Sequence, residues 1–167
     1  EIIHDLSLCL PDVYHLSGDI RDISPEGVQR IRDAYPGLKI MQALPVYSGV
    51  PYEEQWPTIL ELIRKYEPTT DYFLIDTKDP QSTIGIGATG ATHDRTIDRA
   101  IVEATKVPCI IAGGLDPDNV AEAIHVAHPY GVDTCTRTNL PKEQQDITNG
   151  LKDREKVRAF IEATKNA

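Results

Sequence analysis

The stretch IGIGATGATHD, from Ile84 to Asp94, places flexible backbone beside two titratable side chains. It holds three glycines and two threonines, ends on His93 and Asp94, and runs into RTIDRAIVEAT, a pattern typical of a helix. Glycine accepts backbone angles that other residues resist, so this loop could fold closely over a ligand. Asp94 has a second interpretation, because aspartate is a favoured N-cap for a helix that begins at Arg95.

A second glycine cluster points to anion binding. Gly113 and Gly114 end the apolar run VPCIIAGG and lead into LDPDNVAEAI, which we expect to be helical. The first turn of a helix offers free N–H groups and a partial positive charge, so it can hold a phosphate. A tight turn from strand to helix would require the same glycines, and the two interpretations are compatible.

Residues GVDTCTRT, from Gly131 to Thr138, are predicted to form the last strand. Side chains alternate along a strand, which would put Asp133, Cys135 and Arg137 on one face and the threonines between them on the other. If the first face points inward, Arg137 could contact the phosphate directly.

Four of the five histidines allow further interpretations. His93 could tune Asp94, contact a ligand or occupy a solvated loop position, and His15 would be a pocket lining or a satisfied core histidine. His125 and His128 lie toward the end of a predicted helix and are expected at the surface. No H-x-H, HExxH or carboxylate cluster suggests a metal, and we expect no cofactor.

These residues must be positioned by elements that alternate along the chain. After a helical segment that ends near Leu10, five apolar runs each precede an amphipathic one, which gives five β/α units. The predicted strands are DVYHLSGD, LKIMQALPV, DYFLIDT, VPCIIAGG and GVDTCTRT. The predicted helices are SPEGVQRIRDAYPG with Ser24 as N-cap, EEQWPTILELIRKYEP, a helix from about Thr92, DPDNVAEAIHVA and KDREKVRAFIEATKNA.

The strands are apolar throughout and are separated by helices, which indicates a parallel sheet that is buried on both faces. Two arrangements remain open, a (β/α) barrel and a flavodoxin-like open sheet. Both place the ligand at the carboxyl ends of the strands, where the polar and glycine-rich clusters fall. Residues 1–167 are expected to form a single α/β domain.

Composition narrows the classes of partner. The chain has 167 residues, 40% hydrophobic and 26% charged, with a formal net charge of −9. Such a charge disfavours nucleic acid and anionic membrane surfaces, but it does not exclude a small anion held by backbone amides. The longest apolar runs are shorter than the roughly 20 residues of a membrane span, and we see no signal peptide. We expect a cytoplasmic protein.

The three cysteines, Cys9, Cys109 and Cys135, lie far apart in the sequence and form no C-x-x-C pair. This spacing indicates a reducing compartment and no zinc site. Each cysteine is expected to be a small apolar filler.

The motifs FLIDT, GATGATHD, PCIIAGGLDPDNVAEAI, PYGVD and GLKDREKVRAFIEA occur in an order and spacing that resemble the later strands of phosphoribosylanthranilate isomerase. The resemblance is strong over Asp71 to Ala167 and weak over Tyr14 to Val46. It implies an eight-stranded (β/α) barrel that converts an anthranilate-substituted aldose phosphate to the ketose phosphate, an Amadori rearrangement in tryptophan biosynthesis, without metal or cofactor.

The resemblance also implies roles for individual residues. Asp94 matches the general acid that opens the furanose ring, which requires a pocket that raises the pKa of the carboxyl. Asp133 matches an aspartate that orients the sugar or amine. The phosphate would lie between the Gly113–Gly114 turn and the turn after the last strand, near Arg137. Gly90 belongs to the loop that would fold over the ligand.

The sequence departs from the family in three places. It reads TCTRTN where the family usually has a serine- and glycine-rich turn, and it has Ala91 and Arg95 where a lysine and an aromatic residue are more common. These departures suggest a divergent branch. No residue matches the strand with the KICG motif and its cysteine base, or the arginine that holds the anthranilate carboxylate, and Cys9 is no substitute because it lies in a helical segment.

Because no residue matches the cysteine base, we predict that the chain is inactive alone. Five strands also cannot close an ordinary barrel. A second chain, a homodimer or an N-terminal segment of a longer protein could complete it, and we favour the last. Two other functions remain open: a different phosphosugar barrel such as an epimerase, and a non-catalytic phosphosugar-binding or assembly module. An aldolase would need a strand-end lysine, for which Lys78 is the near candidate.

Overall fold

The computed structural model describes residues 2–78, 92–141 and 150–167. The strands in these residues are β1 (Val13–Leu16), β2 (Lys39–Tyr47), β3 (Tyr72–Lys78), β4 (Cys109–Ile111) and β5 (Gly131–Val132). The α-helices are α1 (Ile2–Leu8), α2 (Pro25–Ala34), α3 (Tyr52–Tyr66), α4 (Arg95–Ala104), α5 (Val120–Ala127) and α6 (Arg154–Lys165). Two short 3₁₀ helices follow α3 and β5, η1 (Glu67–Thr69) and η2 (Thr136–Thr138).

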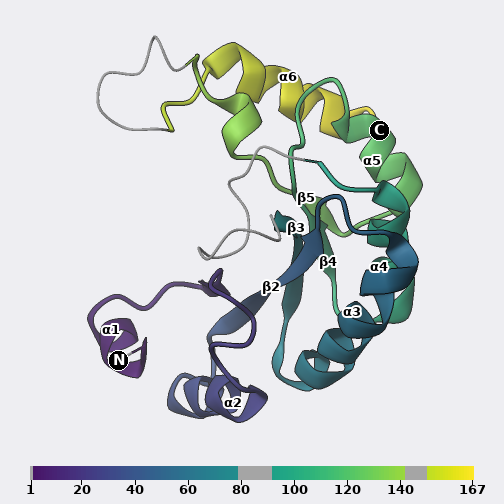
Figure 1. Ribbon diagram of the computed structural model, residues 1–167. Coiled ribbons are helices and arrows are strands. Elements are labelled where there is room, and N and C mark those ends of the chain that lie inside the picture. The colour runs from purple at the N-terminus through teal and green to yellow at the C-terminus, as the bar shows by residue number, and fades with distance from the viewer. Residues whose placement is uncertain (1, 79–91, 142–149) are drawn as a thin grey trace.

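The five strands form one parallel sheet in the order β1-β2-β3-β4-β5. A flavodoxin-like sheet would place its second strand at the edge, in the order 2-1-3-4-5. The consecutive order is that of a (β/α) barrel, and the prediction of a partial barrel with five β/α units is confirmed. Figure 1 shows a curved sheet with α3, α4 and α5 along its outer side and α6 beyond them.

Local sequence signals explain the helix starts. The Ser24 side chain accepts a hydrogen bond from the Gly27 N–H and Pro25 occupies the first turn of α2, as predicted. The Asp153 side chain accepts from the Glu155 and Lys156 N–H groups at the start of α6. Both caps satisfy amides that have no partner within the helix.

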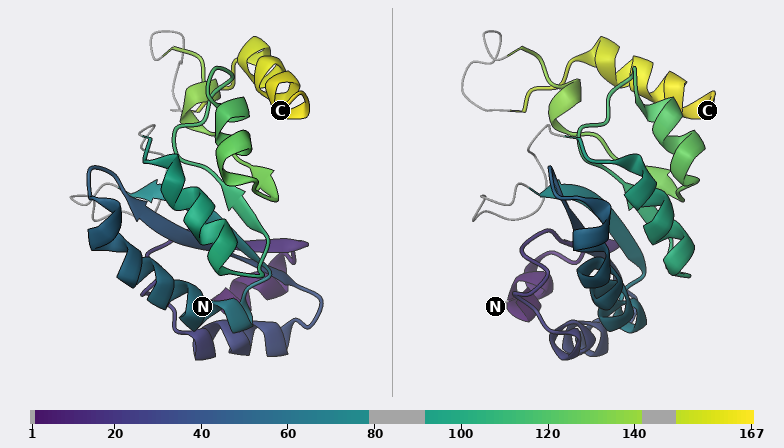
Figure 2. Two further views of the ribbon diagram at one scale, coloured as in Figure 1. Left: turned by 90° about the vertical axis from the view of Figure 1, so that its right-hand side faces the viewer. Right: turned by 45° about the vertical axis from the view of Figure 1, so that its right-hand side comes forward.

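The core lies between the sheet and the outer helices. The two views of Figure 2 show how these helices are arranged along the sheet. Its strand residues include Val46, Phe73, Ile75 and Ile111, and its helical residues include Ile59, Ile63, Ile97 and Ile101. A second apolar cluster joins β1 to α1 and α2. Because the helices cover one face, the carboxyl ends of the strands remain available for a site.

Three sequence predictions need correction. β5 ends at Val132, so most of GVDTCTRT is not a strand, and α5 begins at Val120 rather than directly after the glycines. Cys109 is a buried filler whose burial raises the pKa of the thiol to about 12, but Cys9 and Cys135 are exposed. Among the described helices, none is both long and apolar enough to cross a membrane.

Candidate active site

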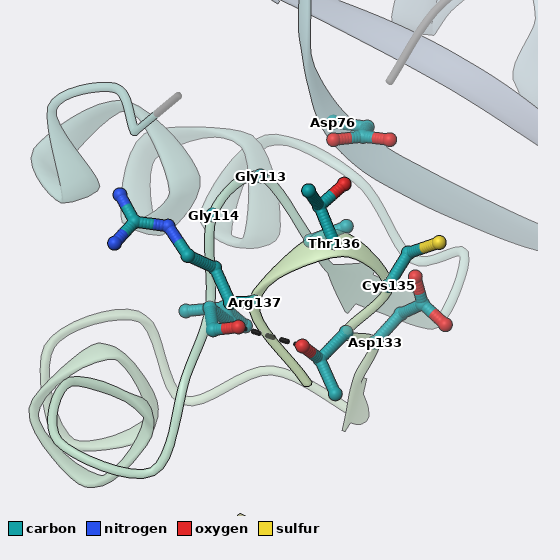
Figure 3. A pocket seen from close by; sticks show the side chains of 10 residues that line it. Asp76, Gly113, Gly114, Asp133, Cys135, Thr136 and Arg137 are labelled. Carbon is teal, nitrogen blue, oxygen red and sulfur yellow. Dashed lines mark hydrogen bonds between the residues drawn. The ribbon is translucent and has the colours of Figure 1, made fainter. Parts of the chain in front are cut away.

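A pocket opens at the carboxyl ends of β3, β4 and β5 (Figure 3). Ile75 pairs with Ile111 and Ile111 pairs with Val132, so the next residue of each strand reaches the same level of the sheet. These residues are Asp76, Ala112 and Asp133, and all three line the pocket. The small side chain of Ala112 leaves space between the two carboxyl groups.

The Gly113–Gly114 turn forms the next part of the pocket wall. Both glycines have positive φ, 77° and 65°, a region that L side chains rarely adopt. A Cβ on Gly113 would come within 2.2 Å of Thr77 Oγ1 and 3.1 Å of His93 Nδ1. Glycine is therefore required at position 113 both by backbone conformation and by space.

The hydrogen bonds of this turn leave its amides available. The Gly113 carbonyl accepts from Arg95 and the Gly114 carbonyl accepts from Asn119, whereas neither glycine N–H has a partner in the described chain. The first turn of α5 lies six residues further on, behind a loop in which Asp116 Oδ1 accepts from the Asp118 and Asn119 N–H groups. An anion at this pocket would meet the turn's own amides rather than the helix end.

Asp76 is a candidate that the sequence did not single out. It faces the pocket from β3 and accepts a hydrogen bond from the Thr77 N–H at 2.7 Å. Burial raises the pKa of this carboxyl, and the negative charge of Asp133 raises it further. Asp76 belongs to the polar sequence IDTKD, residues 75–79, which follows the apolar part of the predicted third strand. That position at a strand's carboxyl end was the signal that could have identified it.

Asp133 and Arg137 do not share a face. Asp133 follows β5 and its N–H donates to the Ile111 carbonyl, after which the chain turns into η2. Arg137 reaches Asp116, with 3.6 Å between Nη1 and Oδ2, and Figure 3 shows it on the opposite side of the turn from Asp133 and Cys135. The predicted alternation is wrong because the strand ends before it could apply.

Asp94 is the N-cap of α4. Its Oδ1 accepts from the Thr96 N–H at 2.9 Å, and the residue is exposed. The structure therefore shows Asp94 as an N-cap. Asp94 is not among the residues that line the pocket in Figure 3, and its role as general acid stays a prediction. Gly90 lies outside the described residues.

His93 is buried rather than solvated, with 1% of its side chain exposed. Its Nδ1 lies 2.7 Å from Thr77 Oγ1 and its Nε2 lies 2.7 Å from Asp98 Oδ1. Asp98 is fully buried and also accepts from Arg95 Nη1 at 3.0 Å. These four side chains, Thr77, His93, Arg95 and Asp98, form a buried network directly behind Gly113.

His15 faces the interior from β1 and is not a satisfied core histidine. Its Nε2 is buried and has no partner among the described residues. Burial lowers the pKa of His15, and the charge of Asp133 acts in the opposite direction. His15 lines a second hollow at the end of β1, which supports the pocket-lining interpretation. His125 and His128 are exposed, as predicted.

Lys78 is buried and forms an ion pair of 2.7 Å with Asp19. It does not line the pocket between Asp76 and Asp133. The described residues contain no group of three or more His, Cys, Asp or Glu side chains that could hold a metal ion.

The parallel strand order and the polar residues at the strand ends define part of a (β/α) barrel whose site lies at the carboxyl edge of the sheet. The family profile described as N-(5'phosphoribosyl)anthranilate (PRA) isomerase matches residues 38–163. The chain belongs to this family.

Individual relatives agree with this membership. The chain is 38% identical over 160 residues to N-(5'-phosphoribosyl)anthranilate isomerase from Haloferax volcanii, covering 95% of this chain and 66% of that protein. It is 34% identical over 145 residues to isomerase 2 of Methanosarcina mazei, covering 87% of this chain and 57% of that protein.

A solved structure of phosphoribosyl anthranilate isomerase from Thermococcus kodakaraensis superposes with a TM-score of 0.71 at 29% identity. The match covers 98% of this chain and 68% of that one. The chain thus spans between about half and two thirds of the length of such curated relatives.

Proposed function

We propose that this chain is the larger part of a phosphoribosylanthranilate isomerase of tryptophan biosynthesis. The observation that carries the proposal is at Gly113 and Gly114, whose N–H groups have no partner among the described residues. Both glycines line a pocket together with Asp76 and Asp133. Backbone amides can hold a phosphate in a chain with a net charge of −9. A solved member of the family is described in complex with reduced 1-(o-carboxyphenylamino)-1-deoxyribulose 5-phosphate.

In this proposal the residues divide the work between binding and proton transfer. The amides of Gly113 and Gly114 bind the phosphate, with Arg137 beyond the turn and Gly90 in the covering loop. Asp94 donates a proton to the ring oxygen as the furanose opens. Asp133 orients the sugar or amine as a carboxylate.

Asp76 adds a second carboxyl group to this set. Burial raises the pKa of this carboxyl and so favours its protonated form, which can donate a hydrogen bond to a sugar oxygen. Asp76 and Asp133 lie at one level of the sheet and line the same pocket, so one sugar can contact both.

Residues 1–167 are proposed to form a single α/β domain, since their five strands belong to one sheet. No residue matches the family's cysteine base, so we propose that turnover requires a complementing N-terminal segment or a second copy. One solved structure is described as mutually generated monomers of the dimeric phosphoribosylanthranilate isomerase from Thermotoga maritima. The cytoplasmic location stays a prediction.

The test joins the chain to the N-terminal third of the Haloferax volcanii relative and measures isomerisation of N-(5'-phosphoribosyl)anthranilate. We expect turnover in the joined protein and none in the 167-residue chain. Asp94→Asn should lower turnover by roughly a hundredfold or more, the range for loss of a general acid, and should leave phosphate binding nearly intact. Phosphosugar binding without turnover in the joined protein would instead favour the non-catalytic module.

A further inference from the structure

The Arg95 guanidinium binds the backbone of the Gly113–Gly114 turn. Its Nη1 donates to the Ala112 carbonyl at 2.9 Å and its Nη2 donates to the Gly113 carbonyl. These are successive carbonyls, and the planar fork of arginine is suited to two acceptors side by side. Arg95 itself does not line the pocket.

This contact fixes the direction of two amides. None of the described peptide bonds is cis, and in a trans peptide the C=O and N–H groups point in opposite directions. Because the Ala112 and Gly113 carbonyls point to Arg95, the Gly113 and Gly114 N–H groups point away from it. Neither of these two N–H groups has a partner within residues 2–78, 92–141 and 150–167, and both glycines line the pocket.

The position of Arg95 is itself held by buried groups. The side chain is 17% exposed, and its carboxylate partner Asp98 is fully buried. Asp98 also contacts His93, which contacts Thr77 on β3. Loss of the ion pair would leave a buried carboxylate without its cation, which is strongly unfavourable. The Gly113–Gly114 turn is thereby connected to β3 of the sheet through Arg95 and the buried side chains behind it.

We propose that Arg95 is a positioning residue of the phosphate site. It holds the Ala112 and Gly113 carbonyls so that the Gly113 and Gly114 amides are aimed at the anion before the anion arrives. The inference rests on the proposed function through the assignment of phosphate to this turn. It also gives a structural role to a residue at which the sequence departs from the family's more common aromatic side chain.

The experiment measures binding of ribose 5-phosphate to the 167-residue chain by calorimetry, with the ¹⁵N–¹H signals of Gly113 and Gly114 followed by NMR. Arg95→Lys keeps the positive charge beside Asp98 but loses the fork, and Arg95→Met loses both. Arg99→Met is the matched control, because Arg99 lies on the same helix and forms an exposed pair with Glu103.

We expect the Kd to rise by about tenfold in Arg95→Lys and in Arg95→Met, as for one misdirected hydrogen bond to a charged group. In Arg99→Met it should change by less than about twofold, since exposed pairs contribute little. The Gly113 and Gly114 signals should shift on binding in the wild type and shift less in Arg95→Lys. If Arg95→Met fails to fold, the Kd and NMR shifts of Arg95→Lys alone test the inference.

Wild-type affinity in Arg95→Lys would overturn the inference, because charge alone would then suffice. A wild-type chain that shows no shift at Gly113 and Gly114 would overturn both the phosphate assignment and the inference. Phosphate binding that depends on Arg95, in a joined protein without isomerase turnover, would contradict the proposed function and leave the inference standing.

Discussion

The end of β4 and the end of β1 both face the carboxyl edge of the sheet, but they differ in how their polar groups are satisfied. At β4 the turn carbonyls and the buried side chains of His93 and Asp98 have partners. Near the end of β1, two buried atoms have no partner among the described residues: His15 Nε2 on β1 and Gln42 Oε1 on the neighbouring strand β2. A braced region can present donors in a fixed direction, whereas buried atoms without partners reduce stability until another group contacts them.

The largest expected effect is at the centre of the braced region. Asp98→Ala should lower the free energy of unfolding by about 4 kcal/mol, since it leaves Arg95 and His93 without their buried acceptor. Urea denaturation measures the loss. Glu103→Ala, which breaks the exposed pair with Arg99, should cost less than about 0.5 kcal/mol. Equal losses in the two variants would show that the β4 region is not braced by this network.

The Gly113 turn gives the next effect. Gly113→Ala should cost about 3 kcal/mol, because the new Cβ would meet Thr77 Oγ1 at 2.2 Å in a left-handed backbone conformation. Gly49 also has positive φ, 74°, but has no atom within 4 Å of the added Cβ. Gly49→Ala should therefore cost only about 1 kcal/mol of backbone strain. Thermal unfolding measures both losses of stability. The difference between them is the cost of the steric clash at Gly113 beyond the cost of backbone strain.

Asp94 combines a smaller stability effect with a test of chemistry. Asp94→Ala should lower stability by about 1 kcal/mol through loss of the cap, and Asp94→Asn should preserve the cap. If both variants lose turnover in the joined protein while only the alanine variant loses stability, the cap and the acid are separate functions of one side chain. Full turnover in Asp94→Asn would show that Asp94 acts only as the N-cap of α4.

The smallest effect concerns pH at the β1 end. Burial lowers the pKa of His15 below its ordinary 6.5, so the unfolded chain binds more protons than the folded chain just below that pH. The contribution of His15 to stability is therefore present above pH 6.5 and is lost as pH falls through the lowered pKa. His15→Asn should flatten the fall in unfolding free energy between pH 7 and 5. If the slope of the unfolding free energy against pH is unchanged in His15→Asn, the pH dependence comes from other titratable groups.

Local patterns in the sequence determined most of the elements. The apolar runs predicted all five strands. Ser24 and Pro25 marked the start of α2, and the glycine pair marked the turn after β4. These signals depend on residues that lie close together in the chain. The same motifs supplied the family resemblance, which the match over residues 38–163 confirms.

The tertiary structure decided which side chains meet. The sequence could not predict that Arg95 donates to the Ala112 and Gly113 carbonyls, because these hydrogen bonds join two separate β/α units. The burial of His93 and the raised pKa of Asp76 depend on neighbours that the sheet brings together. β5 ended early because Asp133 makes its last bond to β4 before the chain turns into η2. Periodicity reports the local environment of a residue, whereas its partners and its electrostatics depend on contacts that only the folded sheet creates.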